Sequence, residues 1–376
     1  MTPFGNGAIN RVNLHASIQA FAQGAGGAFV FVFPLRSGVP APLVLCALAG
    51  MNLTRFALRG AVLPIARRIG LRETLVAGTV LEAAIFPLLT LVHGPELALV
   101  GVIFISAAGS VLYWTCYHAY FAGLGDEEAR GQQVGVREAL IAAIGIVAPA
   151  LGAWAIVRLG PPAAFLAVAA LQALAAAPLL AAPRVPIPRE TDKPSRERRI
   201  AVTLLMADGW FGAGFFYLWQ IALFVTLGER FGVFGGAMAF AGLFGAFGSL
   251  ILGRMIDLGH GQRSVAIAYG FAAISVLLKA ATFSHSGAAA LANACGAVAA
   301  SLVIPALWTR IYNLAKRSAC PLRFHVATEG GWDLGCAAGC LAAAVMISQG
   351  APFSSALLLA LIGAAAAWVM LRRLVS

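Results

Sequence analysis

The sequence predicts an all-α membrane protein with twelve spanning helices, and its composition and segment lengths support this class. The chain has 376 residues, of which 60% are hydrophobic and only 11% are charged. Its mean hydropathy is +0.87, whereas soluble domains are nearer half apolar and a quarter charged. A membrane-spanning helix needs about 20 apolar residues, so about 31 residues per helix and loop allow about twelve spans. Almost no length remains for a soluble domain, which excludes an ordinary globular enzyme.

Apolar runs separated by glycine, proline and charged clusters delimit the expected spans. These are residues 12–35, 41–65, 72–92, 96–122, 137–158, 162–182, 200–227, 235–253, 264–284, 287–314, 324–348 and 354–371. The short polar lead before the first run has no convincing cleavage site, so we interpret that run as a membrane helix. The six cysteines lack a CxxC spacing or a secreted pattern, which argues against a disulfide framework.

The net charge of +11 follows the predicted topology and does not form one amphipathic face. Only Arg36, Arg158 and Arg230 fall on one side of the predicted membrane. The basic residues expected on the other side are Arg11, Arg67, Arg68, Arg72, Arg130, Arg137, Arg184, Arg189, Lys193, Arg196, Arg198, Arg199, Arg254, Arg263, Lys316, Arg317, Arg323, Arg372 and Arg373. The positive-inside rule therefore predicts cytoplasmic N and C termini. We therefore expect the protein to lie in a lipid bilayer and to bind no nucleic acid.

The longest hydrophilic stretch divides the chain in two. Its sequence, RVPIPRETDKPSRERR, combines proline with mixed charge, which is typical of a solvated linker. We therefore expect an N-terminal six-helix half over residues 1–183, a cytoplasmic linker over 184–199 and a C-terminal six-helix half over 200–376.

The two halves repeat several short motifs at nearly the same distance along the chain. The Trp114-Thr115 pair recurs as Trp308-Thr309, and the Gly-Ala-Gly that begins at Gly24 recurs at Gly212. Their common offset predicts a parallel six-span repeat, an arrangement found in transporters built from two halves.

Loop motifs carry a resemblance to a known family. The segment GRMIDLGHGQR, from Gly253 to Arg263, is similar to the loop signature of the major facilitator superfamily, with Asp257 four residues after the glycine. The corresponding first-half segment, LPIARRIGLR, keeps the glycine and the arginines but has no aspartate. The GDEEARG stretch that begins at Gly125 resembles the acidic loop of the same family.

This resemblance implies a secondary transporter in which spans 1, 4, 7 and 10 line a central cavity. It also implies that spans 2 and 11, and spans 5 and 8, pack across the interface between the halves, and that Asp257 and Arg263 belong to an inter-domain gate. Gly145, Pro149 and Gly152 in span five loosely resemble the antiporter glycine-proline motif of the family, with the spacing one residue off.

Ionisable side chains inside the spans need partners or a water-filled cavity, because each costs about 3 kcal/mol or more at mid-bilayer. With a rise of about 1.5 Å per residue, Arg59 and Arg55 lie about 12 and 18 Å in from Arg67. By the same rise, Glu329 and Asp333 lie about 9 and 15 Å in from Arg323. If spans 2 and 11 face each other, as the resemblance implies, we expect Arg59 to meet Glu329 and Arg55 to meet Asp333, as an inter-domain gate on the cytoplasmic side. A permanent structural salt bridge is the alternative.

Asp208 is the first candidate for proton coupling, and Glu82 is the second. Asp208 lies about two turns into span seven, with no basic residue near it in sequence. A carboxyl group among apolar side chains can take up a proton near neutral pH. The alternative role is a cap on a neighbouring helix break.

Aromatic pairs in spans four and ten indicate a substrate cavity. Trp114 and His118 share a helix face at a four-residue spacing, and Trp308 and Tyr312 repeat that arrangement. These faces could hold a planar or apolar solute between them, and an interfacial aromatic belt is the alternative.

Three further polar residues and one tryptophan complete the expected cavity. His15, Gln19 and Gln23 repeat every four residues in span one, so they should face the cavity or another helix. Trp219 in span seven is a weaker candidate for the same lining.

A metal site is the alternative use of span eleven. His325, Glu329, Asp333, Cys336 and Cys340 lie within about 80° of one helix face, and a borderline cation would accept such ligands. They extend over more than three turns, however, so they cannot all reach one ion. The sequence contains no nucleotide-binding loop, nucleophile elbow or zinc-enzyme motif, so we expect no enzyme activity and no cofactor.

The combined expectation is a monomeric, multi-pass secondary transporter of the bacterial inner (cytoplasmic) membrane. It would move a small organic solute by alternating access, coupled to protons and in the direction of export. The alternatives are a divalent metal-ion transporter and a non-transporting assembly or sensor protein with a transporter fold.

Overall fold

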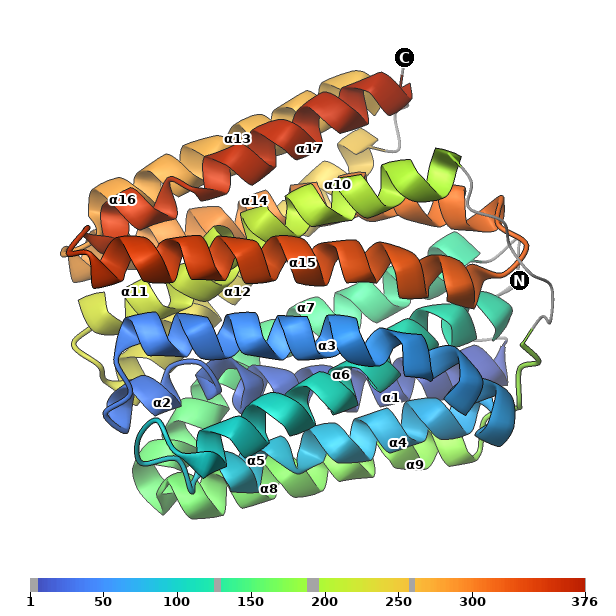
Figure 1. Cartoon of the computed structure of the whole chain (residues 1–376), viewed down its shortest axis with the longest axis horizontal. Helices are drawn as coiled ribbons and strands as arrows, with labels where there is room; N and C mark the ends of the chain where they lie inside the picture. Colours follow the sequence, from blue (N-terminus) through green and yellow to red (C-terminus); the bar gives the residue numbers. More distant parts are fainter. Residues whose placement is uncertain (1–5, 125–129, 188–195, 257–260, 376) are drawn as a thin grey trace.

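The computed structural model describes residues 6–124, 130–187, 196–256 and 261–375, and every regular element in these ranges is helical. Figure 1 shows long helices that lie roughly along one direction. Eleven helical segments in the described ranges are long and apolar enough to cross a membrane. They confirm all the expected spans except the third, 72–92.

The helices of the first half begin with α1 (Gly7–Ala25), a short 3-10 turn (Gly27–Phe29) and α2 (Phe33–Arg36). They continue with α3 (Ala41–Ile69), α4 (Leu71–Ala83), α5 (Ile85–Leu89), α6 (Leu97–Leu124), α7 (Arg130–Leu159), α8 (Pro161–Leu174) and α9 (Ala176–Leu180).

The second half begins with α10 (Arg196–Gly212), a π-helical segment (Ala213–Leu218) and α11 (Trp219–Thr226). It continues with α12 (Phe231–Ile256), α13 (Gly261–Thr282), α14 (Ser286–Lys316), α15 (Pro321–Ser348), α16 (Phe353–Leu357) and α17 (Ala360–Val375).

The third expected span is divided between α4 and α5. Pro87 has no N–H to donate to the carbonyl four residues before it, so the α-helical ladder is interrupted at this point. Neither piece alone reaches the length of a membrane span. Pro178 has the same place relative to the break between α8 and α9.

The helices form two groups in Figure 1, α1–α9 in the lower part and most of α10–α17 in the upper part. The most extensive contacts between the groups are those of α3 with α15 and of α7 with α12. The predicted boundaries at 183/184 and 199/200 stay a prediction, since residues 188–195 of the linker lie outside the described residues.

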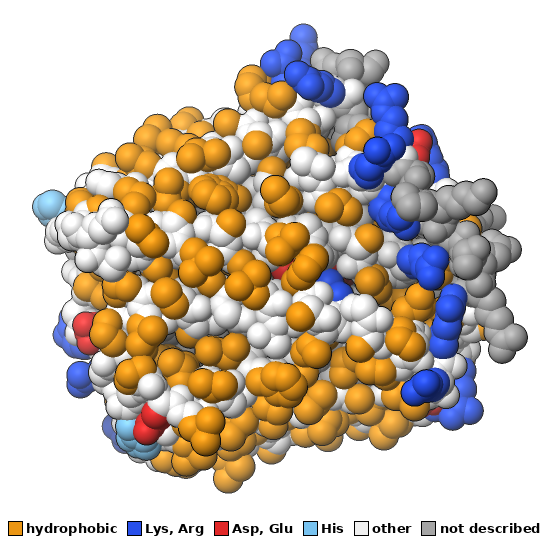
Figure 2. Space-filling model, viewed as in Figure 1, with side chains coloured by type: hydrophobic (Ala, Val, Ile, Leu, Met, Phe, Trp, Pro, Cys, Tyr) orange, Lys and Arg blue, Asp and Glu red, His pale blue; other side chains and the backbone are white. Residues whose placement is uncertain are grey.

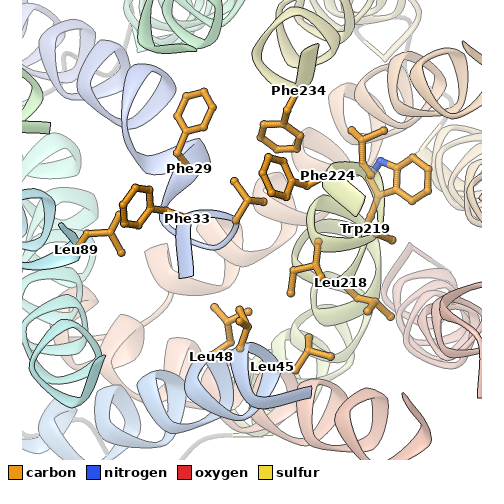
Figure 3. Packing of buried hydrophobic residues seen from close by; sticks show 14 of the residues in the cluster. Phe29, Phe33, Leu45, Leu48, Leu89, Leu218, Trp219, Phe224 and Phe234 are labelled. Carbon is orange, nitrogen blue, oxygen red and sulfur yellow. The ribbon is translucent and has the colours of Figure 1, made fainter. Parts of the chain in front are cut away.

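Lys and Arg side chains gather at one end of the molecule, and apolar side chains cover the length between the ends (Figure 2). Both termini lie at this basic end (Figure 1). At the opposite end a buried hydrophobic cluster joins the two groups of helices. Phe29 packs edge-on against Phe234 with ring centroids 5.8 Å apart, and Phe224 packs against the same ring at 5.5 Å (Figure 3).

The packing of α10 on α15 depends on glycine. A Cβ placed at Gly335 would lie 2.7 Å from the carbonyl carbon of Met206, which is backbone and cannot move aside. We expect Gly335→Ala to destabilise the protein by about 1–3 kcal/mol, the usual cost of overpacking.

The matched control is Gly101→Ala in α6, where a Cβ meets nothing within 4 Å. Alanine is the better helix former, so this variant should be neutral or slightly stabilising. Thermal unfolding in detergent measures both, and equal melting temperatures for the two variants would contradict the close approach of α10 and α15.

Candidate functional site

A buried cluster of charged side chains joins α3 of the first half to α15 of the second. Arg59 donates a hydrogen bond from Nη1 to Glu329 Oε2 at 2.7 Å and another from Nε to Asp333 Oδ2. Arg55 Nε lies 3.2 Å from Asp333 Oδ1. Both expected ion pairs are therefore present, and Arg59 additionally joins the two carboxylates. All four side chains are buried.

A threonine from α6 completes this cluster. Thr115 accepts a hydrogen bond from Arg59 Nη1 at 3.1 Å and donates one to Glu329 Oε2 at 3.3 Å. Four buried atoms of the cluster have no hydrogen-bond partner, namely Arg55 Nε, Arg59 Nη2, Glu329 Oε1 and Asp333 Oδ1. A buried ion pair is most stable when all its polar atoms have hydrogen-bond partners. Because several atoms here have none, this cluster is less stable than a fully paired one.

Next to this cluster, the aromatic faces of α6 and α14 contact each other directly. His118 stacks on Trp308 with ring centroids 4.9 Å apart, and its Nδ1 is 2.8 Å from the hydroxyl oxygen of Tyr312. The His325 ring also stacks on His118, with ring centroids 5.5 Å apart. The expected pairs do face each other, but in this conformation His118 fills the space in which a solute was expected. Trp114 packs against His118 at 5.9 Å and remains 41% exposed.

The polar residues of α1 have their partners within the first half. Gln19 donates to Glu82 Oε2 at 2.6 Å, and Gln172 of α8 donates to the same oxygen at 3.2 Å. Gln23 lies at the edge of this network, 3.5 Å from Glu82 Oε2. His15 contacts the Ala175 carbonyl at 2.7 Å. These side chains face other helices of the same half, α4 and α8, which is one of the two placements expected for them.

Asp208 of α10 has a partner on α15. Its Oδ2 accepts a hydrogen bond from Trp332 Nε1 at 3.2 Å. The Trp332 ring lies 5.4 Å from the guanidinium carbon of Arg55, which is a cation–π distance. The first proton-coupling candidate is thus connected through one tryptophan to the charged cluster on α3 and α15.

The remaining expected site residues lie apart from this region. Trp219 is buried in the second half, where its Nε1 donates to Asn293 Oδ1 at 3.0 Å. Arg263 is exposed near the start of α13. Asp257 lies outside the described residues.

The span-eleven stripe does not form a metal site in the described part of the chain. No three His, Cys, Asp or Glu side chains there converge in a way that could hold a metal ion. Glu329 and Asp333 instead bind the two arginines. In this conformation a metal ion is therefore not held by the ligands proposed as the alternative, which are His325, Glu329, Asp333 and Cys336.

A small cavity lies between the end of the first span and helices α3 and α6. Its volume is about 30 Å³, and apolar side chains such as Val30, Met51 and Val102 line it almost entirely. None of the residues expected to line the substrate cavity contributes to it.

A family model for the Major Facilitator Superfamily matches residues 17–322. The chain belongs to this superfamily. The match covers most of both groups of helices, including α3, α6 and α14, which contribute to the buried cluster and the aromatic contacts. No curated protein matches the chain in sequence.

Several solved transporter structures share the fold of this chain. A proton dependent oligopeptide (POT) family transporter aligns with a TM-score of 0.72 at 11% identity, covering 96% of this chain and 100% of the other. The human organic anion transporter MFSD10 (TETRAN) aligns with a TM-score of 0.72 at 16% identity, covering 98% and 100%. A D-xylose-proton symporter aligns with a TM-score of 0.68 at 16% identity, covering 97% and 95%. At these identities the likeness concerns the fold alone.

Sequence reasoning did not identify Thr115, Gln172 and Trp332 as site residues. Thr115 stands in the repeated Trp-Thr motif, so that repeat was a usable signal. Gln172 is a single polar residue in an apolar span, and Trp332 directly precedes Asp333; both acquire a role only through helix packing.

Proposed function

We propose that this superfamily member is a proton-coupled secondary active transporter that moves a small organic solute by alternating access. The observation that carries the proposal is the buried charge cluster between α3 and α15. Two arginines from one half and two carboxylates from the other meet where the halves must separate for one side to open. The incomplete hydrogen bonding of this cluster supports a gate rather than a permanent salt bridge.

The proposed topology has twelve spans, with α4 and α5 together forming the third, and both termini in the cytoplasm. The clustering of basic side chains at the end that holds both termini supports this orientation. In that orientation the charged cluster and the His118 contacts close the cytoplasmic side, and the phenylalanine cluster around Phe29 closes the other side. Arg263 and Asp257 are proposed to contribute to the cytoplasmic gate.

Proton coupling is proposed to act through Asp208 and Trp332. An ionised Asp208 accepts the indole hydrogen of Trp332, and Trp332 in turn packs against Arg55. Protonation of Asp208 weakens this hydrogen bond, because the carboxyl group loses its charge. Trp332 is then free to move, and Arg55 loses a contact that holds it beside Asp333.

Glu82 is the second proposed proton site. Amide groups of Gln19 and Gln172 donate to one of its oxygens, while Gln172 Oε1 has no partner. That unpaired oxygen could accept the hydrogen of a protonated Glu82. Two of the compared transporters, the D-xylose symporter and the oligopeptide transporter, are described as proton-coupled, which favours a proton over another coupling ion.

The solute is proposed to bind between the halves, with Trp114, His118, Trp308 and Tyr312 as its aromatic contacts once the two faces separate. We further propose a monomer in the bacterial inner membrane that exports its solute, and the span-five glycine-proline motif supports this direction. No observation on the described residues favours a metal ion or an assembly role, and the superfamily fold favours a transporter over an enzyme.

Purified protein in proteoliposomes with an internal pH dye tests the proposal. Organic cations, organic anions and divalent metals are added in turn. Proton movement in response to an organic solute supports the proposed function. A response to divalent metals alone would replace the organic solute with a metal ion, and silence across a broad panel, with a stable protein partner on purification, would favour the assembly role.

A further inference from the structure

A lysine is buried in the membrane-spanning part of α13, outside the charged cluster of α3 and α15. Lys279 is only 2% exposed. Within the described ranges, none of the ion pairs that carboxylates form includes it. A charged group inside a membrane span is costly and marks a functional position unless its packing explains it.

The partner of Lys279 is a backbone carbonyl of the π-helical segment. In an α-helix the Trp219 N–H would donate to the carbonyl of Phe215, four residues earlier. Here that N–H donates to the Gly214 carbonyl, five residues earlier. The Phe215 carbonyl therefore lacks its α-helical donor, and Lys279 Nζ donates to it at 2.9 Å. Such wide turns occur mostly as single bulges at functional positions.

Two aromatic rings and a glycine shape the position of the ammonium group. Lys279 Nζ lies 3.5 Å from the ring centroid of Phe215 and 5.3 Å from that of Trp219. These cation–π contacts replace part of the lost hydration. On the other side, a Cβ at Gly296 of α14 would lie 2.8 Å from Nζ, so glycine makes room for the lysine.

The same π-helical segment contacts the first half of the chain. The Tyr217 ring packs edge-on against Phe31 with centroids 5.0 Å apart. Converting the bulge to a regular α-helix changes the hydrogen-bond register by one residue, which rotates the neighbouring side chains by about 100°. The shape of the segment thus decides whether Tyr217 reaches Phe31.

We propose that Lys279 is a positioning residue of the transport cycle. Its ammonium group holds the π-helical segment in the form that places Tyr217 against Phe31, and so closes the end of the molecule opposite the basic residues. The inference rests on the proposed function, because this closure matters only in a protein whose two ends open in turn.

The test compares Lys279→Met, which removes the donor and the charge, with Gly296→Ala, which keeps the lysine but displaces its head. Ser275→Ala is the matched control, one turn away on the same helix, and its hydroxyl has no partner. Each change is made in a Cys46→Ser, Val30→Cys background, since Cys46 is the exposed native cysteine. Val30 is half-buried beside Phe31, so this background keeps the Phe31–Tyr217 contact. Two quantities are measured without any solute: alkylation of position 30 by a membrane-impermeant maleimide, and hydrogen exchange of amides 213–220.

Lys279→Met and Gly296→Ala are each expected to raise both rates on the order of tenfold, as the loss of one charge-assisted hydrogen bond implies. Ser275→Ala should leave both rates at the parent value. Alkylation at the parent rate in both test variants, even with a lowered melting temperature, would reduce Lys279 to a packing role and overturn the proposal. If Lys279→Met is not recovered folded, Gly296→Ala decides alone. Failure of the proposed function is a separate result, namely no solute-driven flux in the parent protein.

Discussion

Arg59→Met is expected to abolish solute-driven proton flux, with a loss of at least about 100-fold. Arg59 bonds to Glu329, Asp333 and Thr115 together. Removing one partner of a buried ion pair costs about 3–5 kcal/mol, because the other charges remain buried without compensation. Since about 1.4 kcal/mol corresponds to a factor of ten, the closed cytoplasmic state loses most of its population. Proton flux in proteoliposomes measures the effect.

Arg68→Met is the control for the Arg59 variant, since Arg68 lies on the same helix and is exposed. It should transport at close to the parent rate. Exchanging the charges with Arg59→Glu and Glu329→Arg should recover only part of the activity, because Asp333 then faces a second carboxylate. Full activity in Arg59→Met would show that the α3–α15 cluster has no part in transport.

Asp208→Asn is expected to separate proton movement from solute movement. The amide oxygen of asparagine can still accept the hydrogen bond from Trp332, but the side chain can no longer bind or release a proton. Solute exchange between the two sides should persist within about a factor of three, whereas solute-driven proton flux should fall at least tenfold, as expected for the loss of an essential proton carrier. Radiolabelled solute exchange and the pH dye are read on the same vesicles.

Glu82→Gln is the companion variant for this measurement. It keeps the shape of the side chain within the network of Gln19 and Gln172. If Asp208 is the coupling group, Glu82→Gln retains solute-driven proton flux. Loss of coupling in Glu82→Gln together with normal coupling in Asp208→Asn would transfer the role to Glu82.

The helical fold and the charged cluster were largely predictable from the sequence. Apolar runs of membrane length have few alternatives to helices, because every backbone polar group must be paired in lipid. Charges in such runs are rare, so the depths of Arg55, Arg59, Glu329 and Asp333 predicted their pairing once the family resemblance had placed spans 2 and 11 face to face. The division of the third span at Ala84 was less visible, because the sequence marks it only with Pro87 and a single proline is tolerated within many membrane helices.

Contacts that arise from helix packing could not be predicted in the same way. Helical spacing showed that Gln19 and Gln23 share a face, but it did not show that this face turns toward Glu82. Helical spacing paired Trp114 with His118 and Trp308 with Tyr312, yet only the structure shows the His118 ring in contact with both Trp308 and His325. Lys279 depends on a π-helical bulge, and no spacing rule in the sequence indicates one.

The separation of α3 from α15 is the central claim, and a distance measurement tests it most directly. Spin labels are placed at two exposed positions, Arg68 in the last turn of α3 and Ala319 in the connection just before α15. The distance between the labels is measured by pulsed electron paramagnetic resonance in liposomes, with and without transported solute, across a range of pH. The account predicts a short distance for the closed cytoplasmic side and a second, longer distance that grows in population with solute or pH. One short distance under all conditions, in vesicles that transport the solute, would contradict it.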